Sequence, residues 1–294
     1  MPPRLPPHDL PRLPRRRADL SKRDCGRVIV AGGAAGMAGA ASLAASAALR
    51  SGAGLVEAVV PDVVAAIVAG FDPCVMVHGL PSRGGSFAAA AAGPLREACS
   101  RGEALVIGPG CGRTESVRDL VVAAWREADL PAVIDADGLW ALAAHGVEAV
   151  GAAGGPRILT PHAGELLRLL GRNPAATTPA DRPALEAEAA DLAARLGAVV
   201  VFKGPGTFVT DGTVGTRNET GNPGMATAGT GDVLAGVIAA LLAQGLDSRA
   251  AARLGTWVHG LAGDVAAEAL GEVSLTARDL LERLPAGFRA AADG

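Results

Sequence analysis

The sequence predicts an α/β fold, a three-layer α/β/α sandwich with a mainly parallel central sheet. Short apolar runs rich in Val and Ile alternate with longer stretches of helical spacing. This alternation is typical of a parallel sheet with helices on both faces. Glycines and polar residues follow the apolar runs, which places a candidate ligand site at the carboxyl ends of the strands.

The predicted strands are short and stop at turn signals. They are Arg27–Ala31, Leu55–Val60, Ala104–Ile107, Ala132–Asp135, Arg157–Thr160, Ala198–Phe202 and Thr207–Thr210, with a further short strand at Val214. Asp211-Gly212 is a hairpin signal. The predicted helices are Gly36–Ser51, Thr114–Ala128, a helix from about Asp137, Leu185–Leu196, Thr230–Gln244, Ser248–Leu270 and Leu275–Leu284.

The chain divides into a tail and one domain. Residues 1–24 are rich in Pro and Arg without apolar periodicity, and we expect a disordered extension there. Residues 25–294 show neither an internal repeat nor a linker, so we expect one domain.

Charge and cysteine usage exclude several functions. A formal charge of -3 and the lack of a basic patch with interleaved aromatics argue against nucleic-acid binding. The four cysteines form no C-x-x-C pair and have no zinc spacing, which fits a reducing, cytoplasmic location.

One uncharged run, Val28–Leu49, is long enough to span a bilayer and follows three arginines. It is dominated by Ala and Gly, which transfer weakly into lipid, and a polar segment separates it from the arginines. We therefore expect no membrane association.

The strongest motif is Ala228-Gly-Thr-Gly-Asp232 before the apolar run Val233–Ala243. Gly229, Thr230 and Gly231 would lie at a helix N-terminus, where free N–H groups and the helix dipole bind anions. Asp232 would lie in the first turn and could accept a proton from a hydroxyl that attacks phosphorus. Alternatively, Thr230 caps the helix and Asp232 only complements its dipole. The motif alone does not separate these interpretations.

The surrounding motifs resemble the ADP-dependent (S)-NAD(P)H-hydrate dehydratases, a ribokinase-like family. The signature Asn222-Pro-Gly-Met-Ala-Thr-Ala leads directly into Gly-Thr-Gly-Asp. Upstream matches follow in the family's order: Gly36–Ala40 with Ala48–Leu55, Gly108–Gly112, Asp135-Ala-Asp137, Thr160–Glu165 and Lys203–Thr207. The resemblance covers nearly all of the chain from about Gly26.

The resemblance implies the reaction and its ligands. Hydrated NADH or NADPH, in its S epimer, would be phosphorylated on the ring hydroxyl by ADP with Mg²⁺, and loss of phosphate would restore the reduced cofactor. A homotetramer is implied as well. About 25 residues precede the first strand, too few for the epimerase domain that the family often carries. We therefore expect a separate NAD(P)H-hydrate epimerase as a functional partner.

The resemblance also implies residue roles. Asp232 would be the base, and Gly229, Thr230 and Gly231 would form the anion hole, with Gly231 also contacting the nucleotide. Glu165 would act in the second shell of the magnesium ion, although His162 stands where ribokinase relatives have Asn. The hydrated dinucleotide would contact Ala40, Gly110, His162 and Asp232. ADP would contact Lys203, Gly204, Pro205, Gly206 and Thr207.

Several alternatives stay open. His162 by itself is typical of capping or packing, and Asp135-Ala-Asp137 could supply catalytic carboxylates or a strand end that feeds a helix cap. Gly138 and Trp140 depart from the Ala and Asn that we expect in relatives, which puts an Asn-mediated contact in doubt. A ribokinase-like kinase of a vitamin or sugar alcohol would share Gly-Thr-Gly-Asp, and a non-catalytic dinucleotide-binding protein is a third possibility.

Overall fold

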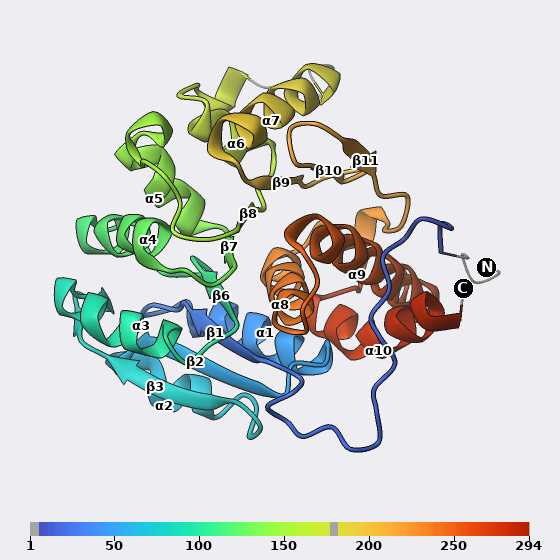
Figure 1. Cartoon of the computed structure of the whole chain (residues 1–294), viewed down its shortest axis with the longest axis horizontal. Coiled ribbons are helices and arrows are strands. Elements are labelled where there is room, and N and C mark those ends of the chain that lie inside the picture. The colour runs from blue at the N-terminus through green and yellow to red at the C-terminus, as the bar shows by residue number, and fades with distance from the viewer. Residues whose placement is uncertain (1–5, 177–181, 294) are drawn as a thin grey trace.

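The computed structural model describes residues 6–176 and 182–293, and its centre is a nine-stranded sheet (Figure 1). The strand order is β11-β10-β9-β8-β7-β6-β1-β2-β3, parallel from β9 to β3 and antiparallel at β10 and β11. The strands are β1 (Arg27–Ala31), β2 (Leu55–Pro61), β3 (Met76–Leu80), β6 (Ala104–Ile107), β7 (Ala132–Ile134), β8 (Arg157–Leu159), β9 (Val199–Phe202), β10 (Phe208–Thr210) and β11 (Gly215–Arg217). A separate hairpin pairs β4 (Ser82–Arg83) with β5 (Ser86–Phe87).

Helices cover both faces of the sheet, which confirms the predicted three layers (Figure 1). One face carries α1 (Ala38–Arg50), α2 (Asp62–Ala69), α8 (Thr230–Ala243), α9 (Ser248–Leu270) and α10 (Ala277–Asp293). The other carries α3 (Ala92–Cys99), α4 (Glu115–Glu127), α5 (Asp137–His145), α6 (Ala163–Leu169) and α7 (Arg182–Leu196). Short 3₁₀ turns are η1 (Ala89–Ala91), η2 (Val147–Ala149), η3 (Pro174–Ala176) and η5 (Pro223–Met225).

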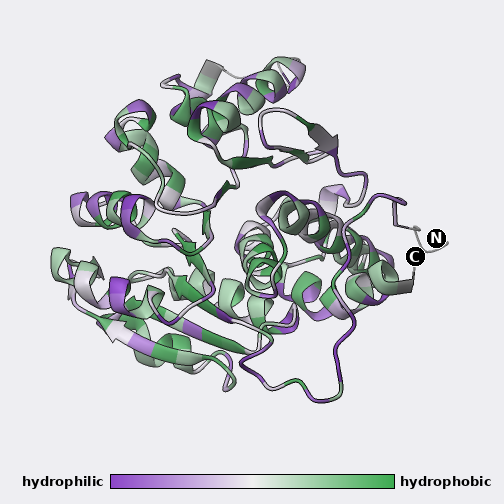
Figure 2. Ribbon diagram, in the orientation of Figure 1, coloured by the Kyte–Doolittle hydropathy of each residue, from purple (hydrophilic) through white to green (hydrophobic). Residues whose placement is uncertain are grey.

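The period-two alternation of strand residues builds two separate apolar cores. In β1, Val28 and Val30 pack towards α1 and α8, whereas Ile29 and Ala31 pack on the opposite side. Both faces of the strand are buried, which explains why its sequence is continuously apolar. Figure 2 shows the same pattern, with hydrophobic residues along the strands and α8 and hydrophilic ones on the outer helices.

The sheet topology decides where a ligand can bind. The chain leaves β1 towards β2 and β3 on one side and later returns to β6 on the other side. Ligands of open α/β sheets bind at such a switch point, beyond the carboxyl ends of the strands. The parallel strands β1, β6, β7, β8 and β9 are followed there by Gly32, Gly108, Asp135, Thr160 and Lys203.

The described part of the N-terminal extension contacts the domain at a few points. Residues 6–24 form no helix or strand and are mostly exposed, and their trace passes beside α9 and α10 before it loops outward (Figure 1). Leu10 is buried in the core beside α9, Asp9 pairs with Arg253 at 2.6 Å, and Arg16 donates to the carbonyl of Gly52. Composition missed these contacts because each depends on residues distant in the chain. Residues 1–5 lie outside the described part.

The secondary structure agrees with most predicted ranges and adds elements that the sequence did not reveal. The hairpin signal at Asp211 is confirmed, because β10 and β11 pair around it. The elements α2, β3, β4, β5, α3 and α6 were not predicted, and α10 continues through Pro285 to Asp293. No helix among the described residues is long and apolar enough to cross a membrane.

A buried arginine joins β8 to the end of α4. Arg157 is 1% exposed, and its guanidinium donates to the carbonyls of Ala124, Trp125, Leu130 and Ala128, and to that of Pro156. Ala124 and Trp125 lie in the last turn of α4 and Ala128 directly follows it, where most carbonyls lack a partner within the helix. Burial lowers the pKa of Arg157 to about 10, so the side chain stays charged at neutral pH.

We predict that Arg157→Met lowers the free energy of unfolding by about 3 kcal/mol, because five carbonyls lose a buried, charged donor. Urea denaturation measures this change. Arg118→Ala, which removes a half-buried surface arginine from α4, should cost less than ~1 kcal/mol. Equal effects of the two substitutions would contradict the role given to Arg157.

Candidate active site

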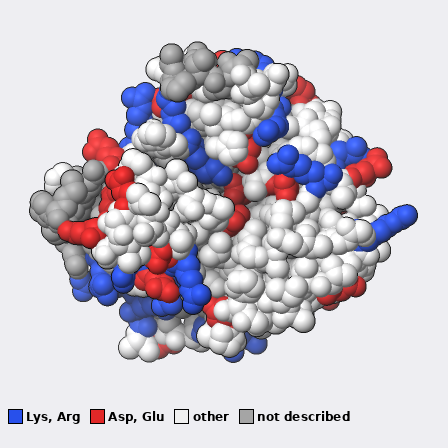
Figure 3. All heavy atoms as spheres, turned by 180° about the vertical axis from the view of Figure 1, so that it is seen from behind, with Lys and Arg blue, Asp and Glu red and all other residues white. Residues whose placement is uncertain are grey.

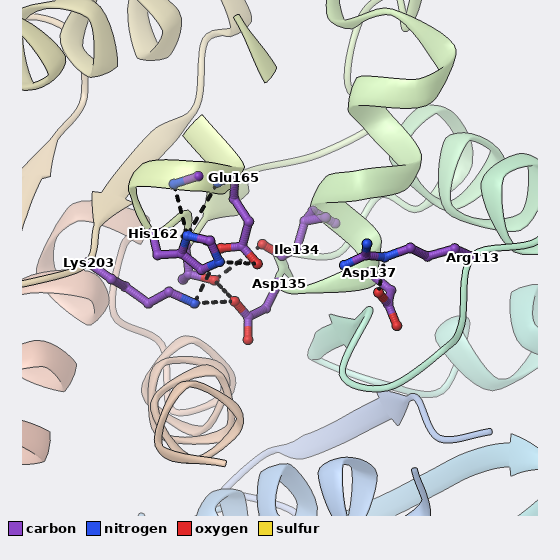
Figure 4. A network of polar contacts seen from close by, with 9 residues as sticks. Arg113, Ile134, Asp135, Asp137, His162, Glu165 and Lys203 are labelled. Atoms are coloured by element: carbon purple, nitrogen blue, oxygen red, sulfur yellow. Dashed lines mark hydrogen bonds and ion pairs between the residues drawn. The ribbon is translucent and has the colours of Figure 1, made fainter. Parts of the chain in front are cut away.

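A buried ion pair marks the centre of the candidate site. Lys203 Nζ lies 2.8 Å from Asp135 Oδ1, and Thr160 Oγ1 donates to the same oxygen at 2.6 Å (Figure 4). Asp135 is 1% exposed. These three residues, Asp135, Thr160 and Lys203, follow β7, β8 and β9 in that order. Because the three strands are adjacent in the sheet, their carboxyl ends bring the side chains together. Asp135 is therefore one of the carboxylates of the site and caps no helix.

The first turn of α8 faces this ion pair. Gly229 has a left-handed φ of 92° and serves as N-cap without a side-chain hydrogen bond. A Cβ on Gly231 would lie 3.3 Å from Lys203 Nζ and 3.7 Å from Asp135 Oδ2. Glycine at this position thus keeps a gap open between the free N–H groups of the helix and the ammonium group. Both are positive and can bind a phosphate from opposite sides.

Thr230 does not cap α8, contrary to one of the sequence interpretations. Its hydroxyl donates to the carbonyls of Met225 and Thr227, which ties the signature loop to the helix. His259 Nε2, on α9, lies 2.9 Å from the carbonyl oxygen of Thr230. Burial lowers the pKa of His259 to about 4, so the ring is neutral and donates its N–H to that oxygen. The sequence gave no sign of His259, because its partner lies 29 residues away.

The electrostatics of Asp232 suit a general base. Burial first and the neighbouring Asp135 second raise the pKa of Asp232 to about 7, although Lys203 opposes them. The N-terminus of α8 favours the ionised form as well, yet burial outweighs it. A base with a pKa near the working pH is partly ionised and still binds a proton well. Complementing the helix dipole alone would not produce this shift.

Lys203 keeps its charge despite its burial. Desolvation alone would lower its pKa, but Asp135 and then Glu165 outweigh it and raise the pKa. Glu165 Oε2 lies 3.8 Å from Lys203 Nζ, and burial raises the pKa of Glu165. The ammonium group is therefore a permanent positive charge beside the phosphate position.

His162 and Glu165 form the capping box of α6. His162 Nδ1 accepts the backbone N–H groups of Gly164 and Glu165, and Glu165 Oε2 accepts the N–H of His162. Burial, followed by Lys203, lowers the pKa of His162, so the neutral ring carries its proton on Nε2. The side chain remains 57% exposed. His162 therefore caps a helix and can still present Nε2–H to a ligand.

The Lys203–Thr207 loop is organised by an arginine that the sequence did not reveal. Arg182 donates to the carbonyls of Lys203 and Phe202 at 3.0 and 3.2 Å and to that of Gly206 at 3.3 Å. Its guanidinium also lies 4.0 Å from the ring centre of Phe202. No local motif links Arg182 to a loop 21 residues later, so only the fold shows this contact.

Two further predicted ligand contacts lie beside one another at the switch point. A Cβ on Gly110, whose φ is 60°, would lie 3.0 Å from the Cβ of Ala40 and from the Cβ of Met37. The Gly108–Gly112 turn thus contacts the start of α1. Gly204, Pro205 and Thr207 lie on the β9 side of Asp135, whereas Ala40 and Gly110 lie on the β6 side. The candidate residues therefore form two groups around α8.

Asp137 has a structural role beside the site. Its carboxylate accepts the N–H of Gly112 and the Nε–H of Arg113, both at 2.9 Å. It is the first residue of α5, and the N-cap is Ala136, whose φ is 48°. Asp137 therefore fixes the Gly108–Gly112 turn and is not the N-cap of α5, which was one of the two roles that the sequence left open.

The donor set around the site fits a lightly held cation. Across residues 6–176 and 182–293, no group of three or more His, Cys, Asp or Glu side chains could hold a metal ion. Mg²⁺ usually keeps several waters and needs only one or two carboxylates when phosphates supply the other ligands. Glu165, engaged in the capping box, fits contact through such waters better than direct coordination.

Charged side chains outside the site form no continuous basic field on the face seen in Figure 3, where both signs are scattered over a largely uncharged surface.

A three-layer sandwich in which a glycine-rich helix N-terminus faces a buried lysine, with an aspartate in the same turn, is typical of the ribokinase-like class. The arrangement resembles solved ribokinase from Arabidopsis thaliana in fold alone, with a TM-score of 0.52 at 16% identity. The family model described as NAD(P)H-hydrate dehydratase matches residues 28–286. The chain therefore belongs to the NAD(P)H-hydrate dehydratase family.

Individual relatives agree with this assignment. The ADP-dependent (S)-NAD(P)H-hydrate dehydratase of Xanthomonas campestris is 36% identical over 90% of this chain and 91% of its own length. A bifunctional NAD(P)H-hydrate repair enzyme of Moorella thermoacetica is 45% identical over 93% of this chain. The chain spans about half the length of this and the other bifunctional relatives, 51% in the Moorella enzyme.

A solved structure gives the same answer. The ADP/ATP-dependent NAD(P)H-hydrate dehydratase from Bacillus subtilis, co-crystallised with ATP and Mg²⁺, superposes with a TM-score of 0.80 at 27% identity. It covers 97% of this chain, and this chain covers the whole of it. The predicted family and fold are therefore confirmed.

The raised pKa of Asp232 has a consequence for stability. A carboxyl group whose pKa is higher in the folded than in the unfolded protein destabilises the fold as pH rises from about 4 through about 7. We predict that Asp232→Asn increases the free energy of unfolding at pH 8, on the order of 2 kcal/mol, and by less at pH 5. Denaturant titrations at the two pH values measure this.

The matched control is Glu127→Gln, at an exposed carboxylate of α4, which should change stability little at either pH. A loss of stability in Asp232→Asn at pH 8 would contradict the buried, disfavoured carboxylate.

Proposed function

We propose that the protein catalyses the ADP-dependent dehydration of the S epimer of hydrated NADH and NADPH and so restores the reduced cofactor. Family membership supports the substrate class. The observation that carries the chemistry is the first turn of α8, which faces Lys203 and Asp135 across a gap and holds Asp232 beside it. This gap would bring together the nucleotide phosphate, the ring hydroxyl of the substrate and Asp232 as the proton acceptor.

The chain's own residues divide the first step among them. Asp232 takes the proton of the ring hydroxyl as the hydroxyl oxygen attacks the terminal phosphorus of ADP, and the bond from that phosphorus to the bridging oxygen breaks, so that AMP leaves. The N–H groups at Gly229, Thr230 and Gly231 bind the transferring phosphoryl oxygens, and Lys203 neutralises their charge from the opposite side. Asp135 and Thr160 hold the ammonium group in position. The nucleotide binds to the loop of Lys203, Gly204, Pro205, Gly206 and Thr207, and Gly231 contacts its phosphate end.

The second step needs less from the protein. Hydroxide is a poor leaving group and phosphate is a good one. The ring nitrogen donates its electron pair as the C–O bond breaks, phosphate leaves, and loss of a ring proton restores the dihydronicotinamide. Ala40, Gly110 and His162 hold the dinucleotide so that its ring hydroxyl faces Asp232.

Magnesium completes the proposed site. Glu165 would hold the ion through its bound waters, and the ion would supply positive charge to the nucleotide phosphates. Glu165 fits this role because it lies beside Lys203 and its carboxylate is already fixed by the capping box.

The setting of the enzyme is part of the proposal. We propose a cytoplasmic homotetramer, whose substrate supply depends on a separate NAD(P)H-hydrate epimerase that converts the other epimer. The bifunctional repair enzymes among the relatives support this functional pairing.

Purified protein given hydrated NADH, ADP and MgCl₂ should regenerate the absorbance of NADH at the rate at which phosphate appears. Asp232→Asn should lower kcat by about 10³-fold, because the hydroxyl loses its proton acceptor. Asp264→Asn is the matched control, since Asp264 orders the signature loop through Gly221 and Asn222 but has no place in the proton transfer.

The result separates the candidate functions. Consumption of nucleotide with vitamin or sugar alcohols, but not with hydrated NADH, would indicate a small-molecule kinase. Binding of both ligands without any turnover would indicate a non-catalytic protein.

A further inference from the structure

A second cation stands at the site, on the side opposite Lys203. Arg113 follows the Gly108–Gly112 turn, and its guanidinium points towards the centre of the site with Asp135 between it and Lys203 (Figure 4). Its Nε donates to Asp137 Oδ1 at 2.9 Å. The two terminal nitrogens of Arg113 have no hydrogen bond or ion pair within the described ranges 6–176 and 182–293.

Asp137 holds this arginine in a defined orientation. One carboxylate oxygen binds Arg113 and the other binds the N–H of Gly112, so side chain and turn are fixed to the same group. Asp137 is 13% exposed and Arg113 is 55% exposed. A guanidinium held by its Nε edge presents its outer NH₂ groups to solvent, in the planar geometry that suits a phosphate.

The charge around the site calls for a second cation. Four carboxylates lie close together here, those of Asp135, Asp137, Glu165 and Asp232. Their proximity is shown by the pKa of Asp232, which each of the other three raises. Lys203 is already bound to Asp135. Both proposed ligands carry phosphates, and two anionic ligands in an acidic site need a positive group each. Lys203 lies on the nucleotide side, whereas Arg113 adjoins Gly110.

The charge of Arg113 also reaches the mouth of the site. The pKa of His162 is lowered mainly by burial, then by Lys203, and in part by Arg113. Arg113 and Lys203 therefore both act on the space around His162, which is half-exposed there.

We propose that Arg113 binds the diphosphate of the dinucleotide substrate and that Asp137 positions the guanidinium for this contact. The inference rests on the proposed function, since it takes the hydrated dinucleotide as the phosphoryl acceptor. Arg113 is a binding residue for the second ligand and takes no part in the proton transfer at Asp232.

Equilibrium binding tests the inference without turnover. Hydrated NADH is titrated into the full-length protein in the absence of ADP, by calorimetry, for wild type, Arg113→Ala and Arg113→Lys. Loss of a bidentate, charge-assisted contact should weaken binding about 10- to 100-fold in Arg113→Ala. Arg113→Lys should recover only part of the loss, because an ammonium group cannot bind bidentately.

Steady-state kinetics supply the second readout. The KM for hydrated NADH should rise in Arg113→Ala, while the KM for ADP and kcat stay within about 2-fold of wild type. Arg118→Ala is the control, since it removes the same charge from nearby α4, where Arg118 pairs with Glu115 and Asp119. Asp137→Asn should show a smaller rise than Arg113→Ala, because Arg113 remains but is less firmly held.

The outcomes keep the two proposals apart. Wild-type turnover with unchanged dinucleotide binding in Arg113→Ala overturns the inference and leaves the proposed function standing. A rise in the KM for ADP instead would assign Arg113 to the nucleotide. Binding of hydrated NADH that depends on Arg113 but is never followed by turnover would support the inference and contradict the proposed function.

Discussion

The site depends on one constraint: the N-terminus of α8 must lie against the carboxyl ends of β7, β8 and β9. There the buried Asp135–Lys203 ion pair meets the free N–H groups of the helix and the carboxyl of Asp232. Separating a buried charge from its partner is costly, so Asp135 and Lys203 hold each other in place. Neither strand nor helix could shift by a residue without breaking this arrangement.

Close packing behind α8 keeps the helix in that place. A Cβ on Gly236 would lie 2.1 Å from the carbonyl oxygen of Ala44, so α8 and α1 touch backbone to backbone. The Ala side chains of α1, among them Ala41, Ala44 and Ala48, are fully buried against this contact. The Ala- and Gly-rich run that could be mistaken for a membrane span is therefore the surface that allows α1 to pack under α8. The Ala- and Gly-rich composition of α1 therefore matters for the site, because the close packing that it allows places Asp232 of α8 beside the Asp135–Lys203 ion pair.

The sequence predicted what local signals encode. Strand–helix alternation gave the layers, and the signature Asn222–Asp232 predicted an anion site at a helix start, where glycines leave free N–H groups open to a ligand. Contacts between segments that are distant in the chain could not be predicted from the sequence. Arg182, His259 and the partnership of Arg113 with Asp137 depend on the fold, and no spacing rule marks them. The docking of Leu10 was missed for the same reason, since a Pro- and Arg-rich segment has the composition of a solvated tail. The roles of Asp135 and Asp137 were left open by the sequence, and only their partners tell them apart.

The central claim is that burial and Asp135 together keep the Asp232 carboxyl near its midpoint at neutral pH. A titration of the side-chain carboxyls by ¹³C NMR, in wild type and in Asp135→Asn, measures this directly. We expect the Asp232 carboxyl of wild type to titrate with a pKa of about 7. In Asp135→Asn the pKa should fall, because a negative neighbour is lost and Lys203 is freed to face Asp232. A wild-type pKa near the ordinary value for aspartate, or no change in the variant, would contradict the account.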